Sequence, residues 1–186
     1  MQRARSSQMI VLVLTFASAA ALDERISTVA KKCCPAAAFE CCYDAIDFHT
    51  RLSCEEIPEV KRAEAMRCVQ TEFHGEKDMK WTGIDHIGCC EAFKSDYTDP
   101  RGICYATCKF ALTAPSLKSR AKLHLIEHCR MTNPLNTCFN QCRIEHNEKT
   151  AKGLPIPAYA SVETDRCARY KMKDDELYPI NQIMKA

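Results

Sequence analysis

Cysteine is the residue type with the greatest chemical potential in this sequence. The chain has 14 cysteines among 186 residues, and six of them form the adjacent pairs Cys33-Cys34, Cys41-Cys42 and Cys89-Cys90. Cysteines bind metal ions, exchange electrons or form structural disulfides, and structural zinc sites commonly use C-x-x-C spacing. Since no C-x-x-C occurs in the sequence, the pattern favours structural disulfides over a zinc or redox site.

The amino terminus indicates an oxidising compartment. Residues 1–21 begin with Arg3 and Arg5, continue through the apolar run MIVLVLTF and end in small residues. This order is typical of a secretory signal peptide, cleaved here after Ala21 or Ala19. The apolar run is shorter than the roughly 20 residues that span a bilayer, and no later segment is long and apolar enough to do so. We therefore predict a secreted, extracellular protein without a membrane span.

All the cysteines follow the predicted cleavage site, and their even number permits complete pairing. We expect every one of them in a disulfide: Cys33, Cys34, Cys41, Cys42, Cys54, Cys68, Cys89, Cys90, Cys104, Cys108, Cys129, Cys138, Cys142 and Cys167. Thirteen lie within residues 33–142, so Cys167 pairs either with this core or with a second molecule. We favour the bond to the core, and hence a monomer.

Two histidines have the spacing of a helical metal site. His124 and His128 are four residues apart, as in H-E-x-x-H metal-binding helices. Glu127 adjoins His128, however, so the metalloprotease order is not present. We interpret the pair as a solvated or half-buried face and predict no metal site and no cofactor.

Catalytic pairs are incomplete in this sequence. Asp85-His86 and the pair Asp47 and His49 need a nucleophile, but no G-x-S-x-G elbow occurs. A phospholipase A2 type of site would need a His-Asp pair beside the helix cysteines and a glycine-rich calcium loop, and the five glycines form no such loop. We predict that the protein is not an enzyme.

Net charge excludes further classes of function. The chain carries +2, and loss of two arginines with the signal peptide leaves 24 basic and 24 acidic residues. A neutral chain lacks the electrostatic attraction that dominates binding to nucleic acids or to anionic membranes. We therefore expect an extracellular protein or an apolar ligand as the partner.

The periodicity of apolar residues is helical throughout. It predicts an all-α, disulfide-rich array of five or six short helices, with a cysteine-rich domain at 22–146 and an irregular tail at 147–186 that Cys167 ties back. The predicted helices are 35–48, 58–73, 85–94, 103–113, 116–129 and 133–147. Proline leads the helix at 58–73, and Ser116 and Asn133 are the expected N-caps of the last two helices. The expected apolar stripe of the helix at 116–129 is Leu117, Ala121, Leu125 and Cys129.

Cysteine spacing limits the possible cross-links. Cys104 and Cys108, like Cys138 and Cys142, share one helix face because they are four residues apart. If these helices pack antiparallel, Cys104 pairs with Cys142 and Cys108 with Cys138; if parallel, the partners are exchanged. Adjacent cysteines on a helix point about 100° apart, so each vicinal pair is expected to join its helix to two partners.

The order of the later cysteines resembles a known module. GCC at 88–90, followed by Cys104, Cys108, Cys129 and the pair Cys138 and Cys142, is similar to the nematode-type secreted cysteine-rich modules such as the DB module. The resemblance covers about 55 residues. It implies a small, secreted, non-enzymatic domain.

These observations lead to one favoured function and two alternatives. We expect a secreted protein that acts by binding or as an extracellular structural component. A carrier of lipid or another apolar ligand is the first alternative, because disulfide-linked helices can enclose a cavity. A secreted hydrolase is the second. Trp81 is the only tryptophan and is a candidate anchor for a partner, although a packing role is more common for such a residue.

Overall fold

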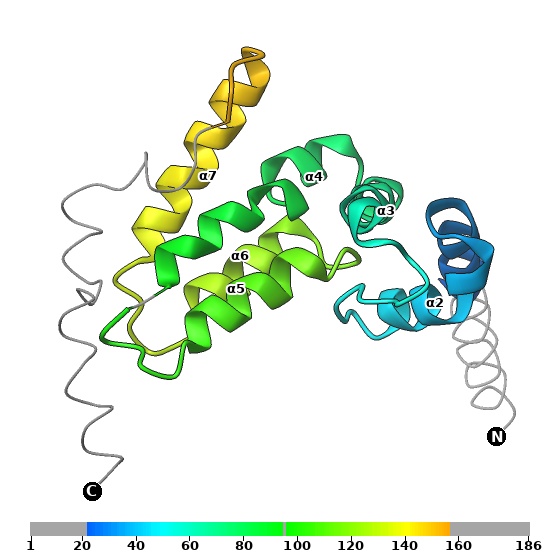
Figure 1. The fold of residues 1–186 in the computed structure, drawn as a ribbon, viewed down its shortest axis with the longest axis horizontal. Helices are drawn as coiled ribbons and strands as arrows, with labels where there is room; N and C mark the ends of the chain where they lie inside the picture. Colours follow the sequence, from blue (N-terminus) through cyan, green and yellow to red (C-terminus); the bar gives the residue numbers. More distant parts are fainter. Residues whose placement is uncertain (1–21, 95, 157–186) are drawn as a thin grey trace, which may run out of the picture.

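The computed structural model describes residues 22–94 and 96–156, and the elements assigned in these ranges are helices, which confirms the all-α prediction (Figure 1). Residues 22–33 are helical. The elements that follow are η1 (Ala36–Ala38), α2 (Phe39–Asp47), α3 (Glu59–His74), α4 (Glu76–Trp81), η2 (Ile84–Phe93), α5 (Ile103–Thr113), α6 (Ser119–Glu127) and α7 (Asn136–Ala151). The helices at 22–33 and α4 were not predicted from the sequence. Within the described ranges, no helix has both the length and the apolar character that a membrane crossing requires.

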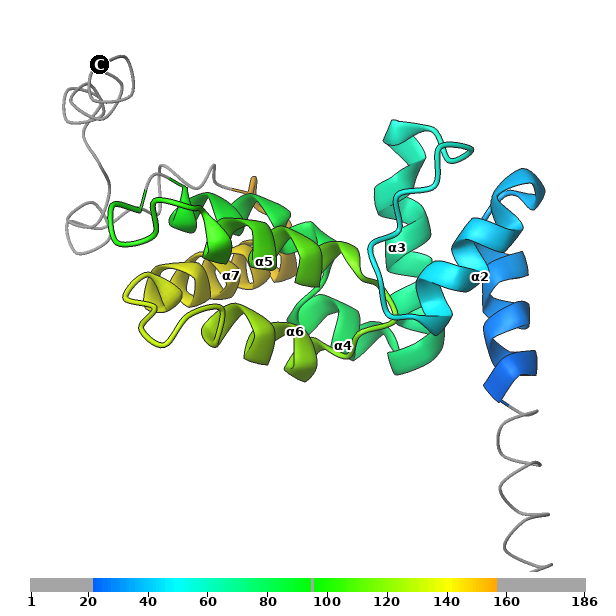
Figure 2. The same cartoon turned by 90° about the horizontal axis from the view of Figure 1, so that it is seen from below.

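The apolar core has two parts, at opposite ends of the described structure (Figure 2). The first, here called the N-terminal cluster, is formed by residues 22–33, α2, α3 and the loop between α2 and α3, and contains Ile46 and Val69. The second, the C-terminal cluster, is formed by η2, α5, α6 and α7. Phe93 and Phe139 stack at its centre with ring centroids 5.9 Å apart. Ile87 packs against both clusters.

The disulfides are divided between the two clusters. The N-terminal cluster holds Cys33–Cys68, Cys34–Cys42 and Cys41–Cys54, and the C-terminal cluster holds Cys89–Cys142, Cys90–Cys108 and Cys104–Cys129. Each vicinal pair joins two different partners, as predicted. Both predicted pairings of the C-x3-C motifs are wrong. The reason is that η2 packs against both α5 and α7, so its vicinal pair cross-links each of these helices to η2 instead.

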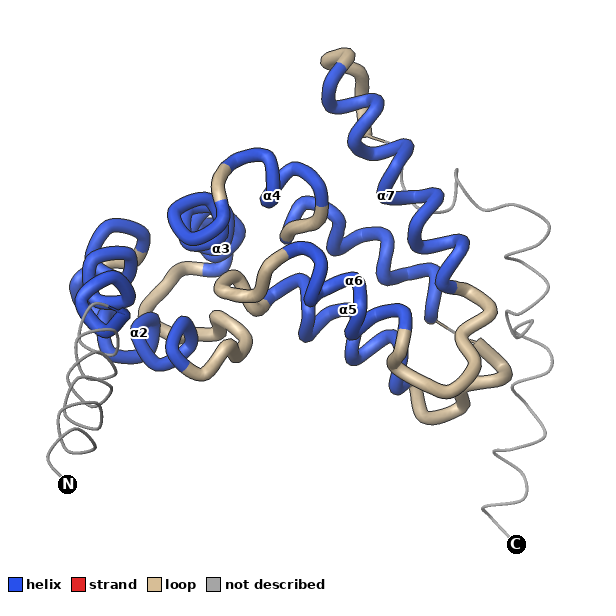
Figure 3. The backbone as a smooth tube through the Cα atoms, turned by 180° about the vertical axis from the view of Figure 1, so that it is seen from behind, coloured by secondary structure: helices blue, strands red, loops and turns tan. Residues whose placement is uncertain are grey.

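Polar contacts, together with Ile87, connect the two clusters. None of these six disulfides joins them. The Leu52 amide donates to the Thr113 carbonyl over 3.0 Å, and Ser116 contacts His49 and His74. Figure 3 shows α3 and α4 between α2 and the pair α5 and α6. The region where α3, α4 and α6 meet is called the junction below.

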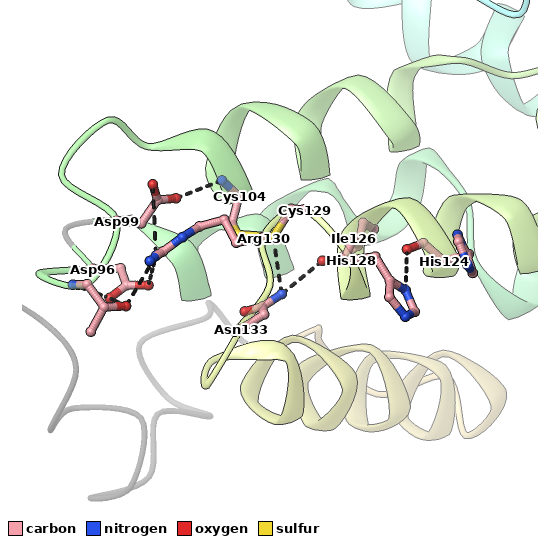
Figure 4. The surroundings of a disulfide bond; sticks show 10 residues. Asp96, Asp99, Cys104, His124, Ile126, His128, Cys129, Arg130 and Asn133 are labelled. Atoms are coloured by element: carbon pink, nitrogen blue, oxygen red, sulfur yellow. Dashed lines mark hydrogen bonds and ion pairs between the residues drawn. A yellow bond between two sulfur atoms is a disulfide. The ribbon is translucent and has the colours of Figure 1, made fainter.

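Two predicted helix caps are wrong. The Ser116 hydroxyl lies 2.9 Å from His49 Nδ1, and α6 begins after Lys118 instead. The Asn133 side chain donates to the Ile126 carbonyl over 2.8 Å, so it is held by the preceding helix and α7 begins at Asn136 (Figure 4). By contrast, α3 begins directly after Pro58, as predicted. α7 runs on to Ala151, past the domain boundary predicted at 146, and Cys167 lies outside the described residues.

Candidate functional site

A groove of about 830 Å³ lies between α4 and the C-terminal half of α7. Its walls are His74, Lys77, Asp78, Lys80, Trp81, Asn147, Thr150 and Ala151. Trp81 is 48% exposed, so a large part of its ring is available to another molecule. α7 projects beyond the other helices on the side of the molecule where α4 lies (Figure 3). We call this feature the Trp81 groove.

Trp81 is held in place from α7. The guanidinium carbon of Arg143 lies 5.6 Å from the centroid of the indole ring, within reach of a cation–π interaction. Arg143 Nη1 also donates to the Trp81 carbonyl over 3.0 Å, and Asn147 Nδ2 donates to the same oxygen over 3.4 Å. α4 itself is set at an angle to α3 by Gly75, whose φ of 84° lies in the region that favours glycine. Contacts from α7 to both the backbone carbonyl and the ring therefore hold Trp81 in place.

The margin of the groove is basic. Lys77 and Lys80 are both exposed on α4, and Lys80 is paired with Glu76 over 3.1 Å. Among the described residues of the walls, the one carboxylate is that of Asp78, which is hydrogen-bonded to Gln70 and Ser119 at the junction. The groove thus offers apolar and aromatic surface with a positive edge.

A polar network fixes α4 to α3 and α6 at the junction. Asp78 Oδ2 accepts from Gln70 Nε2 over 3.1 Å, from the Ser119 amide over 3.1 Å and from the Ser119 hydroxyl over 2.9 Å. Burial by itself raises the pKa of Asp78, but these hydrogen bonds outweigh it and the pKa is lowered. The network ties the basic wall of the groove to both clusters.

Lys122 completes this network from inside the protein. It is fully buried, and its Nζ donates to Gln70 Oε1 over 2.7 Å. Burial lowers the pKa of Lys122 to about 7, against an opposing attraction to Asp78. A buried amine with one protein acceptor is costly to keep charged, so the junction is sensitive to changes in its polar partners.

The predicted apolar stripe of α6 is correct only in part, since Leu125 and Cys129 pack against the C-terminal cluster. The buried residues of this helix are Ser119, Lys122 and Ile126, whereas Ala121 is exposed. The sequence analysis missed this face because it considered only apolar residues for the buried stripe. Ser119, Lys122 and Ile126 are spaced at i, i+3 and i+7, which is the spacing of one helix face and was the available signal.

The candidate Asp85-His86 pair, judged incomplete from the sequence, does not form a catalytic dyad. Asp85 Oδ1 is bonded to Arg67 Nε over 2.6 Å. His86 is buried; its Nδ1 accepts from the Gly83 amide over 3.1 Å, and its Nε2 donates to Asn147 Oδ1 over 2.9 Å. Burial is the main cause that lowers the pKa of His86 to about 4, so the neutral ring links η2 to α7 behind the groove.

The second candidate pair, Asp47 and His49, lies on the surface of the molecule. Asp47 and His49 are exposed, and His49 Nδ1 lies 2.9 Å from the hydroxyl of Ser116, which is only 5% exposed. Within the described residues, the side-chain partner of the His49 ring is this hydroxyl and not a carboxylate that would orient the ring as a base. The contact joins the two clusters. Within the described ranges, no group of three or more His, Cys, Asp or Glu side chains is arranged to hold a metal ion.

Comparison with known proteins gives consistent matches along the chain. The family model described as Caenorhabditis elegans Her-1 matches residues 22–170, which include every residue that the structure describes. A C. elegans protein named Protein her-1 is 30% identical over 123 residues, or 64% of this chain and 70% of that protein. The crystal structure of C. elegans HER-1 matches with a TM-score of 0.61 at 26% identity, covering 79% of this chain and 97% of the other.

Proposed function

The chain belongs to the Her-1 family, and from this membership we propose that it is an extracellular protein that acts by binding a protein partner rather than by catalysis. The secretory signal pattern and the extensive disulfide pairing support this proposal. A nematode family is in keeping with the resemblance noted in the cysteine order, whereas the likeness to the DB module itself is not confirmed.

The observation that carries the proposal is the half-exposed Trp81 on a rigid, basic-edged groove. Tryptophan and arginine are enriched among the residues that dominate binding energy at protein interfaces. The indole is already held by Arg143, so little conformational entropy is lost when a partner covers it. Lys77 and Lys80 favour a partner segment in which an apolar side chain is flanked by acidic residues.

Replacing Trp81 with alanine is expected to weaken partner binding about 30-fold, because a central aromatic anchor contributes at least 2 kcal/mol. The measurement is saturable binding of the labelled, secreted protein to the surface of intact cells from its source organism. Val60→Ala is the matched control, since Val60 is an exposed apolar residue of α3, 87% accessible and outside the groove.

A second variant separates binding from folding. Lys77→Glu with Lys80→Glu reverses the groove margin without removing buried atoms, and we expect it to weaken the same binding while the circular dichroism spectrum is unchanged. Equal binding by the wild type, Trp81→Ala and the charge-reversed variant would contradict the proposal. Native mass spectrometry tests the alternative: an apolar ligand that co-purifies with the secreted protein and is lost in Trp81→Ala would assign the groove to a carrier.

We also propose that the carboxy-terminal tail is tied to the core by a Cys138–Cys167 disulfide. The six disulfides described above use twelve cysteines, and Cys138 is itself disulfide-bonded. Non-reducing peptide mapping of the secreted protein is expected to recover the peptides that contain Cys138 and Cys167 as one linked species. The intact mass should then be that of a monomer, about 14 Da below the reduced chain. A disulfide-linked dimer through Cys167 would contradict this pairing.

A further inference from the structure

Two buried histidine rings lie next to each other behind the Trp81 groove, one on η2 and one on α7. His86 and His146 are 1% and 8% exposed, and their ring centroids are 4.7 Å apart with an interplanar angle of 53°. On α7, His146 lies between Arg143 and Asn147 in the sequence. Both of these neighbours donate to the Trp81 carbonyl. The two rings therefore belong to the framework that holds Trp81 in place.

The hydrogen bonds of His86 require a neutral ring. Asn147 Nδ2 donates to the Trp81 carbonyl, which only accepts, so Asn147 Oδ1 faces His86 and His86 Nε2 carries the proton. His86 Nδ1 then keeps its lone pair, and the Gly83 amide donates to it over 3.1 Å. A second proton can be added only at Nδ1, where the Gly83 carbonyl, 3.3 Å away, would accept it. The buried Gly83 amide would then lose its acceptor, two residues after Trp81.

The charged groups around the two rings do not favour a further proton. On α7, Arg143 is only 8% exposed and acts on His86 as a neighbouring cation. On η2, Asp85 attracts a proton to His146, but its Oδ1 is already bonded to Arg67 Nε of α3 over 2.6 Å. The group that α4 contributes is a backbone carbonyl. Among the described residues, His146 Nδ1 and Arg143 Nε are buried without a hydrogen-bond partner, so a proton on either ring places a second buried cation beside Arg143.

Burial couples the protonation of the rings to the packing of α7. It lowers the pKa of His86 to about 4 from the ordinary value of 6.5, and it lowers the pKa of His146 against the attraction of Asp85. Above pH 6.5 both rings are neutral in the folded and the unfolded chain. As the pH falls from 6.5 toward 4, the unfolded chain binds protons that the folded protein does not, so stability decreases. An opened arrangement that brings the rings into water gains the same protons and is favoured by acid.

We propose that His86 and His146 form an acid-sensitive switch that loosens the Trp81 groove and releases the partner bound there. Protonated rings repel Arg143, which then leaves the indole ring and the carbonyl of Trp81, and the contact between α4 and α7 is lost. The inference rests on the proposed function, because it concerns the regulation of the same groove.

The test uses the full-length secreted protein and the fluorescence of Trp81, the only tryptophan in the sequence. Quenching by acrylamide, which is uncharged, measures the accessibility of the indole ring without any partner. We expect the quenching constant to rise about twofold or more between about pH 5.5 and pH 4, with an unchanged far-UV circular dichroism spectrum. The affinity for intact cells should fall about tenfold over the same interval, as it does when only about a tenth of the molecules keep the groove closed.

Glutamine variants separate the rings from other titrating groups. In His86→Gln the new side chain can accept from the Gly83 amide and donate to Asn147 as the neutral ring does, but it does not titrate. His86→Gln combined with His146→Gln should abolish the rise in quenching. His124→Gln is the matched control, because it removes an exposed histidine of α6, and it should keep the full rise. Nitrogen-15 spectra of the wild-type imidazoles, which need no substitution, should show His86 Nδ1 gaining its proton in the same pH interval.

Three results would overturn the switch: constant quenching of the wild type from pH 7 to 4, a full rise in the double variant, or a loss of helical ellipticity together with the rise. The proposed function fails in a different way. If Trp81→Ala leaves cell binding at pH 7 unchanged, the groove is not the partner site, and the release of a partner from it is overturned even where quenching responds to acid. If Trp81→Ala weakens binding but neither binding nor quenching changes in acid, the switch alone is overturned.

Discussion

Replacing Gln70 with leucine is expected to lower the free energy of unfolding by about 3 kcal/mol, because each buried polar group left without its hydrogen-bond partner costs about 1–3 kcal/mol. Gln70 Oε1 is the acceptor of the buried Lys122 Nζ over 2.7 Å, and Gln70 Nε2 donates to Asp78 Oδ2 and to the Thr82 carbonyl. Leucine has a similar size but can neither accept nor donate a hydrogen bond. Urea denaturation followed by fluorescence of Trp81 measures the loss.

The matched control is Glu64→Gln, an exposed position on the same helix, where we expect a change within about 0.5 kcal/mol. None of the six described disulfides crosses the junction, so the loss of stability in Gln70→Leu should be concentrated there. Hydrogen exchange is expected to accelerate in α4 and at the start of α6, with little change in α5, which Cys90–Cys108 and Cys104–Cys129 hold in the C-terminal cluster. A stability equal to that of the wild type would show that the junction network contributes nothing to holding the clusters together.

The features that the sequence predicts well depend on local order. Pro58 precedes α3, α5 begins within the predicted range at Ile103, and each vicinal cysteine pair has two partners, because helix starts and side-chain directions follow from neighbouring residues. The fold class follows from the same periodicity. These features needed no knowledge of which helices meet.

The features that the sequence did not predict depend on the meeting of distant segments. The burial of Lys122 was not predicted, because its acceptor, on Gln70, lies 52 residues earlier in the sequence. Trp81 was identified as a candidate, but Arg143, which holds it, follows 62 residues later. The buried face of α6 was missed for the same reason. Ser119 and Lys122 are buried because they bond to Asp78 and Gln70, which lie on other helices.

Raising the pH from 7 to about 9.5 is expected to stabilise the wild-type protein, and Lys122 is the cause. Burial lowers its pKa in the folded state to about 7 from the ordinary value of 10.5. Between these two values the unfolded chain binds a proton that the folded protein does not, so the free energy of unfolding rises with pH by up to about 1.4 kcal/mol per unit. Over the whole interval the gain reaches about 4–5 kcal/mol; below pH 7 both states are protonated and Lys122 adds no further slope.

Lys122→Met tests this assignment, because methionine has a similar length and does not titrate. The variant should lose most of the rise in stability between pH 7 and 9.5, although it leaves Gln70 Oε1 without its donor. Lys118→Met, at an exposed position just before α6, should keep the full slope. If Lys122→Met retained the wild-type slope, the rise would belong to another group, and the amine at the junction would be charged throughout. If the slope disappears, the protein keeps at its junction a buried lysine that costs stability at neutral pH.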